Sequence, residues 1–123
     1  MGEQITVLFM PESAYGPTNQ CVGIGKVLLD RGHRVVFAAE RSWEGKLAPL
    51  GFIEALVDLA EPDPDAGEDA AGQYWIDVIR ETAPEFRKPT IEQLATFVQA
   101  TYEALTEGAK YAEPQLRTII AEH

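Results

Sequence analysis

The sequence is short of the residue types that build cross-links and metal centres. It contains one cysteine, Cys21, and two histidines, His33 and His123, in 123 residues. A single cysteine excludes an internal disulfide and a cysteine-based zinc cluster. A mixed site of histidine and cysteine would need more ligands than the chain has. We therefore expect no metal site and no disulfide within the chain.

Basic residues are also scarce. Ten Lys and Arg stand against 20 Asp and Glu, so the formal net charge is −10. Residues 61–123 carry thirteen acids and five bases, a net of −8, whereas residues 1–60 carry seven and five, a net of −2. Nucleic acids and anionic membranes are bound by basic patches, so neither is expected as a partner. An acidic surface of this kind is typical of a solvated face that keeps a chain soluble.

Long apolar runs are absent as well. No run approaches the ~20 residues of a membrane-spanning helix. The N-terminus lacks the basic segment and apolar segment of a secretory signal. These two absences predict a cytoplasmic protein. The length of 123 residues and the 46% share of hydrophobic residues predict a single globular domain over 1–123.

The first half of the chain alternates short apolar runs with helical patterns. Apolar runs at 5–10, 34–39 and 52–59 predict three strands, and helical patterns at 19–30 and 43–50 lie between them. Nearly continuous apolar runs are typical of strands that are buried on both faces, as in parallel sheets. The expected fold class is therefore α/β, with a Rossmann-like parallel sheet in the order β-α-β-α-β. Ligands bind such sheets at the carboxyl ends of the strands.

The second half has a different character. Residues 60–72 combine two prolines, two glycines and five acids, which predicts a mobile acidic loop. Calcium is the alternative reading of that cluster, although its spacing does not match the EF-hand template. A helix is expected over 73–82, and Thr90 begins a long helical region over 90–122 with a capping box. Pro114 is expected to begin or kink its last part.

Glycines near the first helix invite comparison with phosphate-binding motifs. A Walker A motif aligned on Gly25 and Lys26 would place Gln20 at its first glycine and Val27 at its Ser/Thr. The dinucleotide fingerprint also fails, at Leu28. We interpret the glycines as positions of close packing between helix and sheet. A free-standing, flavodoxin-like nucleotide-binding domain remains an alternative function.

The residues around the first helix resemble a known family. Residues 14–20 read A-Y-G-P-T-N-Q, and the helix that follows leads to R-G-H-R-V at 31–35. This pattern resembles the start of the macrolide-type, UDP-sugar-dependent glycosyltransferases of the GT-B fold. Those enzymes open with an apolar strand, a G-H-x-x-P loop, a helix and then R-G-H-x-V at the second strand. The resemblance implies the N-terminal half-domain of a GT-B fold, with three parallel strands followed by helices.

The resemblance also implies a function. The chain would hold the small-molecule acceptor, and a C-terminal domain beyond His123 would hold the nucleotide-sugar donor, so no cofactor is expected in this chain. The family's histidine is the general base on the acceptor hydroxyl, and its position here is Pro17, which cannot titrate. We expect a fragment of a glycosyltransferase that is inactive alone, with Glu12 as an alternative base. The implied acceptor-binding residues are Glu12, Ser13, Tyr15, Gly16, Asn19 and Trp75, and the segment 60–90 would border the same cleft.

Two further expectations depend on Pro17 and on the first strand. The loss of the base at Pro17 favours an alternative function, a non-catalytic binding or interaction remnant of the family. In the family the first strand has a neighbour on each side, so a missing fourth strand would expose an apolar edge at Ile5–Met10. Exposed strand edges pair with other chains. We therefore expect self-association, with a homodimer formed through that edge.

Overall fold

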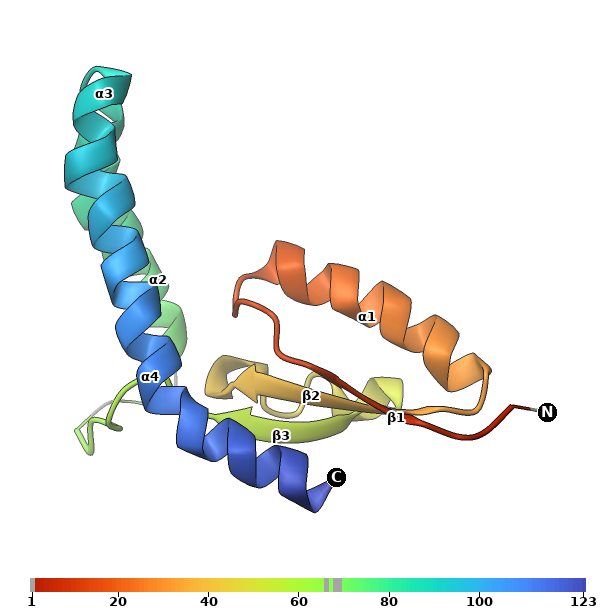
Figure 1. Ribbon diagram of the computed structural model, residues 1–123. Helices are drawn as coiled ribbons and strands as arrows, with labels where there is room; N and C mark the ends of the chain where they lie inside the picture. The colour runs from red at the N-terminus through yellow and green to blue at the C-terminus, as the bar shows by residue number, and fades with distance from the viewer. Residues whose placement is uncertain (1, 66, 68–69) are drawn as a thin grey trace. The chain divides into compact units, whose positions relative to one another are not determined.

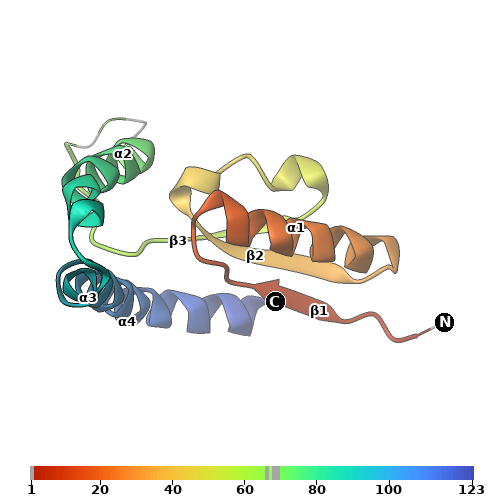
Figure 2. The ribbon, with the colours of Figure 1, turned by 90° about the horizontal axis from the view of Figure 1, so that it is seen from above.

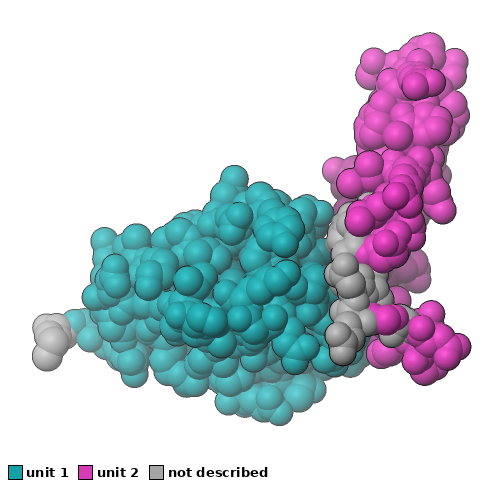
Figure 3. Space-filling model, turned by 180° about the vertical axis from the view of Figure 1, so that it is seen from behind, with its two compact units in different colours: residues 1–58, 113–123 teal, residues 59–112 magenta. Residues whose placement is uncertain are grey.

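Residues 2–65, 67 and 70–123 are described by a computed structural model, and they fall into two units (Figure 3). Unit 1 comprises Met1–Asp58 and Glu113–His123, and unit 2 comprises Leu59–Ala112. The sheet and the candidate site belong to unit 1.

Three parallel strands form the centre of unit 1 (Figure 1). They are β1 (Thr6–Phe9), β2 (Arg34–Glu40) and β3 (Ile53–Val57), in the spatial order β1-β2-β3. The register pairs Leu8 with Val36 on one side of β2 and Ala38 with Ala55 on the other. The expected three-stranded parallel sheet is thus confirmed. Among the described residues, β1 is an edge strand that pairs with β2 alone.

The central strand is buried on both faces, as its apolar run predicts. Side chains alternate between the two faces of a strand, and β2 follows this rule. Val35, Phe37 and Ala39 belong to one buried cluster, which also contains Phe52. Val36 and Ala38 belong to a second cluster with Val57 and Ile119.

A helix covers each face of the sheet (Figures 1 and 2). Helix α1 (Tyr15–Asp30) packs on the first cluster, where Gly25 is buried. A Cβ atom at Gly25 would lie 2.7 Å from Cε1 of Phe52, so the close packing expected of this glycine is confirmed. The same expectation is wrong for Gly23, which is exposed and where a Cβ would meet no atom within 4 Å. The second face is covered by Leu116 and Ile119, which belong to the end of helix α4 (Gln99–Glu122). This two-layer cover is the arrangement of a Rossmann-like half-domain.

Helix α1 begins earlier than its apolar pattern predicts. The expected start was Asn19, but the helix begins at Tyr15, which shortens the loop after β1 to residues 10–14. Pro17 is tolerated because the N–H groups of a first helical turn have no acceptor within the helix. The hydroxyl of Thr18, which is fully buried, donates to the carbonyl oxygen of Glu12 at 3.1 Å and ties this turn to the loop.

The connection from β2 to β3 also differs from the expectation. Instead of one helix over 43–50, it contains two short 3-10 helices, η1 (Arg41–Trp43) and η2 (Ala48–Leu50). Gly45 lies between them with a φ of 74°, a conformation that breaks a helix and suits glycine. Ser42 lies inside η1 and caps no helix.

The helices of the second half run further than predicted. Helix α2 (Ala70–Thr82) is followed by η3 (Ala83–Arg87), α3 (Thr90–Gln93), a π-helical turn η4 (Leu94–Val98) and α4. Of the expected loop over 60–72, residues 66 and 68–69 lie outside the described residues, and residues 70–72 are helical. Alanine favours this early start of α2. Pro114 begins no helix, since α4 continues through it even though a proline in a helix interior is unfavourable.

Nearly all of the described side chains of unit 2 are exposed or half-buried. Only Ala112 among them is buried. Ile91 and Leu94, which begin the apolar stripe of the C-terminal helical region, are 78% and 56% exposed. One aromatic contact orders the turn between the helices, since the rings of Phe86 and Phe97 meet edge to face with centroids 5.0 Å apart.

Candidate functional site

The candidate site lies in unit 1, where the three parallel strands end. Two connections leave this edge of the sheet, namely residues 10–14 after β1 and residues 41–47 after β2. In open α/β sheets this edge is where ligands bind. Three side chains from these connections and the first turn of α1 meet here, and we call Tyr15, Trp43 and Lys46 the aromatic cluster.

Trp43 is the anchor of the aromatic cluster. Its side chain is 6% exposed and joins the same buried cluster as Phe37 and Leu47. The indole Nε1–H donates to the carbonyl oxygen of Ser13 at 2.8 Å. A buried tryptophan needs a partner for this N–H group. The bond therefore satisfies the indole and at the same time holds the loop after β1 against η1.

Tyr15 and Lys46 complete the aromatic cluster at the surface. The ring of Tyr15 packs on that of Trp43 with centroids 5.1 Å apart and planes at 57°. Tyr15 is 67% exposed, so much of its ring faces solvent. Lys46 Nζ lies 5.9 Å from the centroid of Tyr15 and 5.8 Å from that of Trp43, within the range of cation–π attraction. The cluster thus presents an aromatic surface beside a positive charge.

Glu54 holds the segment that carries Lys46. From near the start of β3, its carboxylate accepts hydrogen bonds from the backbone N–H groups of Gly45, Leu47 and Ala48 at 2.9, 2.7 and 2.8 Å. Burial opposes the charged form, but the three donors outweigh it and hold the pKa of Glu54 below its usual range. A turn that has no regular hydrogen-bond ladder is thereby fixed to the sheet.

Two polar pairs lie beside the aromatic cluster on η1. The hydroxyl of Ser42 donates to Oε2 of Glu40, the last residue of β2, at 2.5 Å. Arg41 donates to both oxygens of Asp58, which follows β3, at 2.5 and 3.1 Å. This hydrogen bonding, with the attraction between the two charges, raises the pKa of the Arg41 guanidinium above its usual value. Each of these two carboxylates therefore has a donor within unit 1.

The structure brings together only part of the predicted site. Ser13, through its carbonyl oxygen, and Tyr15 both contact Trp43. Glu12 is exposed, and its carbonyl oxygen binds Thr18. The expected loop positions Gly16, Pro17 and Asn19 prove to be part of helix α1. Trp75 lies in α2 of unit 2, and its side chain is outside the described residues.

Trp43 and Lys46 are the residues that the sequence analysis missed. The signal for Trp43 was its place directly after an apolar strand, at the edge where a parallel sheet binds ligands. Lys46 gave no such signal, because its position depends on the turn that Glu54 organises.

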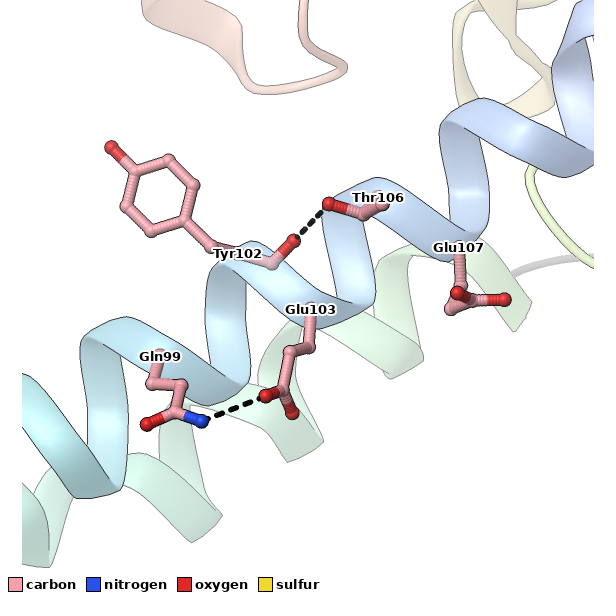
Figure 4. Close-up of a pocket in the computed structure, with 5 residues that line it drawn as sticks. All are labelled: Gln99, Tyr102, Glu103, Thr106 and Glu107. Carbon is pink, nitrogen blue, oxygen red and sulfur yellow. Dashed lines mark hydrogen bonds between the residues drawn. The ribbon is translucent and has the colours of Figure 1, made fainter.

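A shallow depression on α4 is a less suitable site (Figure 4). Its lining comes from one face of a single helix of unit 2. Two hydrogen bonds run along that face, from Gln99 Nε2 to Glu103 at 2.9 Å and from the hydroxyl of Thr106 to the carbonyl oxygen of Tyr102 at 2.8 Å. Ligand sites are concave and are built by several elements. This depression therefore carries no functional argument.

The described part of the chain offers neither a metal site nor a membrane span. Within residues 2–65, 67 and 70–123, no group of three or more His, Cys, Asp or Glu side chains could hold a metal ion. None of the helices described there has the length and apolar character needed to cross a membrane.

No protein-family model matches this chain, and no curated protein matches it significantly. Function is therefore argued from the aromatic cluster and from the sequence pattern around it.

Proposed function

We propose that this chain is the acceptor-binding part of a GT-B-type glycosyltransferase and that it binds a small-molecule acceptor against Tyr15. The observation that carries the proposal is the aromatic cluster at the carboxyl edge of the parallel sheet. Tyr15 belongs to the A-Y-G-P-T-N-Q segment whose resemblance to the family's acceptor loop suggests this function.

The architecture of unit 1 supports the proposal. A parallel β1-β2-β3 sheet with a helix on each face is compatible with the half-domain that such an enzyme needs. Trp43 is held rigidly from below by the core and by the carbonyl oxygen of Ser13. An exposed ring on a rigid support binds a ligand with little loss of conformational freedom. Tyr15 is therefore suited to stack against a planar or ring-containing acceptor.

The proposed reaction needs a general base, and the family's base position is occupied by Pro17. In sugar transfer a base accepts the proton of the acceptor hydroxyl, the oxygen attacks the anomeric carbon, and the nucleoside diphosphate leaves. Pro17 cannot accept a proton. Glu12 is the nearest carboxylate in the sequence that lies in the same loop, and it is exposed to solvent. We assign it as the alternative base for an acceptor held at Tyr15. A nucleotide-sugar bound by a separate donor domain would supply the glycosyl group.

Acceptor binding by the whole chain tests the proposal directly. A panel of polycyclic phenols is titrated and followed by saturation-transfer NMR, with Tyr15→Ala as the test variant. We expect Tyr15→Ala to weaken binding about five- to tenfold through the loss of stacking. Tyr102→Ala is the matched control, because Tyr102 is also 67% exposed but lies in unit 2.

The outcomes separate the proposal from its alternatives. Equal binding by the Tyr15→Ala and Tyr102→Ala chains would contradict the assignment of the site. A rise in melting temperature with free nucleotides but not with phenols would favour a nucleotide-binding domain instead. Once a donor domain is supplied, transfer that survives Glu12→Gln undiminished would reject Glu12 as the base, and a complete lack of transfer would favour a non-catalytic binding module.

A further inference from the structure

Lys46 is an exposed positive charge that pairs with no carboxylate in the described part of the chain. Glu54 accepts three backbone N–H groups, Asp58 binds Arg41, and Glu40 binds the hydroxyl of Ser42, while Glu44, in the same turn, is exposed and forms no ion pair with Lys46. Within the described part of the chain, Lys46 Nζ makes no hydrogen bond and no ion pair, and its contacts are with the two aromatic rings. The ammonium group therefore keeps its capacity to bind an anion.

The ammonium group of Lys46 lies beside the exposed ring of Tyr15. Lys46 is held beside Tyr15 by the segment that Glu54 fixes, so the charge and the exposed ring form one surface. Trp43 lies beneath Tyr15 and is too deeply buried to meet a ligand's ring. A ligand that stacks on Tyr15 would therefore bring its ring substituents within reach of Lys46 Nζ.

We propose that the aromatic cluster selects planar aromatic compounds that carry a carboxylate. The ring stacks on Tyr15, and the carboxylate pairs with the ammonium group of Lys46. The net charge of −10 repels anions at long range, so this preference arises from the local pair and weakens as salt screens it. The inference rests on the proposed acceptor site and names the class of acceptor that the site prefers.

The test compares two ligands of nearly the same shape, 2-naphthoate and its neutral amide, 2-naphthamide. Their dissociation constants are measured by titration calorimetry on the whole chain at low and at high salt. We expect 2-naphthoate to bind about fivefold more tightly than 2-naphthamide at low salt, the upper range for an exposed ion pair. Lys46→Met should abolish the difference by weakening only the naphthoate.

Lys26→Met is the matched control. Lys26 is also exposed in unit 1, and its Nζ donates to the carbonyl oxygen of Leu50 at 3.4 Å, on the outer side of α1. This variant should keep the preference for 2-naphthoate. Circular dichroism spectra of both variants should match that of the unmodified chain, since neither lysine is buried.

The remaining outcomes distinguish the two proposals. Equal affinity of the unmodified chain for both ligands would overturn the anion preference and leave the acceptor site standing. A preference that persists in Lys46→Met would overturn the role of Lys46. Failure of the unmodified chain to bind 2-naphthoate, 2-naphthamide and the phenols would overturn both proposals.

Discussion

The indole N–H of Trp43 donates to the carbonyl oxygen of Ser13 at 2.8 Å and joins the two connections that border the candidate site. The two residues are thirty positions apart in the sequence, and each follows a different strand. The bond uses the backbone of Ser13, so any residue at position 13 could accept it. Trp43, in contrast, is the donor and the anchor of the aromatic cluster.

Replacing Trp43 should therefore cost stability, whereas replacing Ser13 should not. Trp43→Phe keeps a buried ring but leaves the carbonyl oxygen of Ser13 without its donor, which should lower the free energy of unfolding by about 1–3 kcal/mol. Ser13→Ala should change it by less than about 0.5 kcal/mol. Urea unfolding followed by circular dichroism measures both. Equal losses in the two variants would mean that the hydrogen bond does not hold the loops together.

Glu54 should make the stability of unit 1 depend on pH. Because its pKa is lowered in the fold, its contribution to the free energy of unfolding is present above the ordinary glutamate value of about 4.3 and is lost as the pH falls through the lower folded-state value. Glu54→Gln should cost about 2 kcal/mol at pH 7, because hydrogen bonds to a charged acceptor are stronger than those to an amide.

The measurement compares urea midpoints of the unmodified and Glu54→Gln chains at pH 7 and at pH 3. The difference between the two urea midpoints should be smaller at pH 3 than at pH 7, because part of Glu54 is then protonated. Glu44→Gln removes an exposed carboxylate from the same turn and is the control, with an expected change of less than about 0.5 kcal/mol. A gap that is the same at both pH values would show that the charge of Glu54 does not hold the turn.

Two glycines of α1 should respond in opposite directions to alanine. A Cβ at Gly25 would lie 2.7 Å from Cε1 of Phe52 and 3.4 Å from Cγ1 of Val35, so Gly25→Ala should cost about 1–3 kcal/mol. A Cβ at Gly23 would meet no atom within 4 Å, so Gly23→Ala should add about 0.5–1 kcal/mol through helix propensity. Melting temperatures measure the difference. A Gly25→Ala chain as stable as Gly23→Ala would show that the core yields to the methyl group.

The edge of the sheet at β1 should make the chain self-associate. Ile5, at the start of this edge, is 50% exposed, and in the described residues only β2 pairs with β1. We propose that a second copy pairs along this edge, since unpaired strand edges are templates for association. Light scattering should show a mass that rises with concentration, and Ile5→Lys should reduce it.

The matched control for this experiment is Ile24→Lys, because Ile24 is 56% exposed on α1 and away from the strand edge. It should leave association unchanged. A monomer at every concentration, or an equal effect of the two lysines, would count against pairing through β1.

The strands were predictable from the sequence because their signal is local. A run such as Arg34–Ala39 is apolar at nearly every position, which is typical of a short strand with both faces covered. The glycines of the first helix gave a weaker signal, since close packing was expected at Gly23 as well as Gly25 and only Gly25 meets the core. Helix boundaries were less predictable. Pro17 lies in the first turn of α1, where its missing N–H costs no helical bond, and α4 continues through Pro114 although an interior proline is unfavourable.

The candidate site was predictable in place but not in composition. The apolar runs predict parallel strands, and a ligand site is expected at their carboxyl ends. The segment around Tyr15 follows the first of these strands and was therefore a predicted part of the site. The partners of Tyr15 depend on contacts between distant parts of the chain. Trp43 reaches Ser13 across thirty residues, and Lys46 takes its position from a turn that Glu54 binds through backbone N–H groups. Local propensity determines strands and helices, whereas a surface shared by the first turn of α1 and the connection after β2 exists only after those elements have packed.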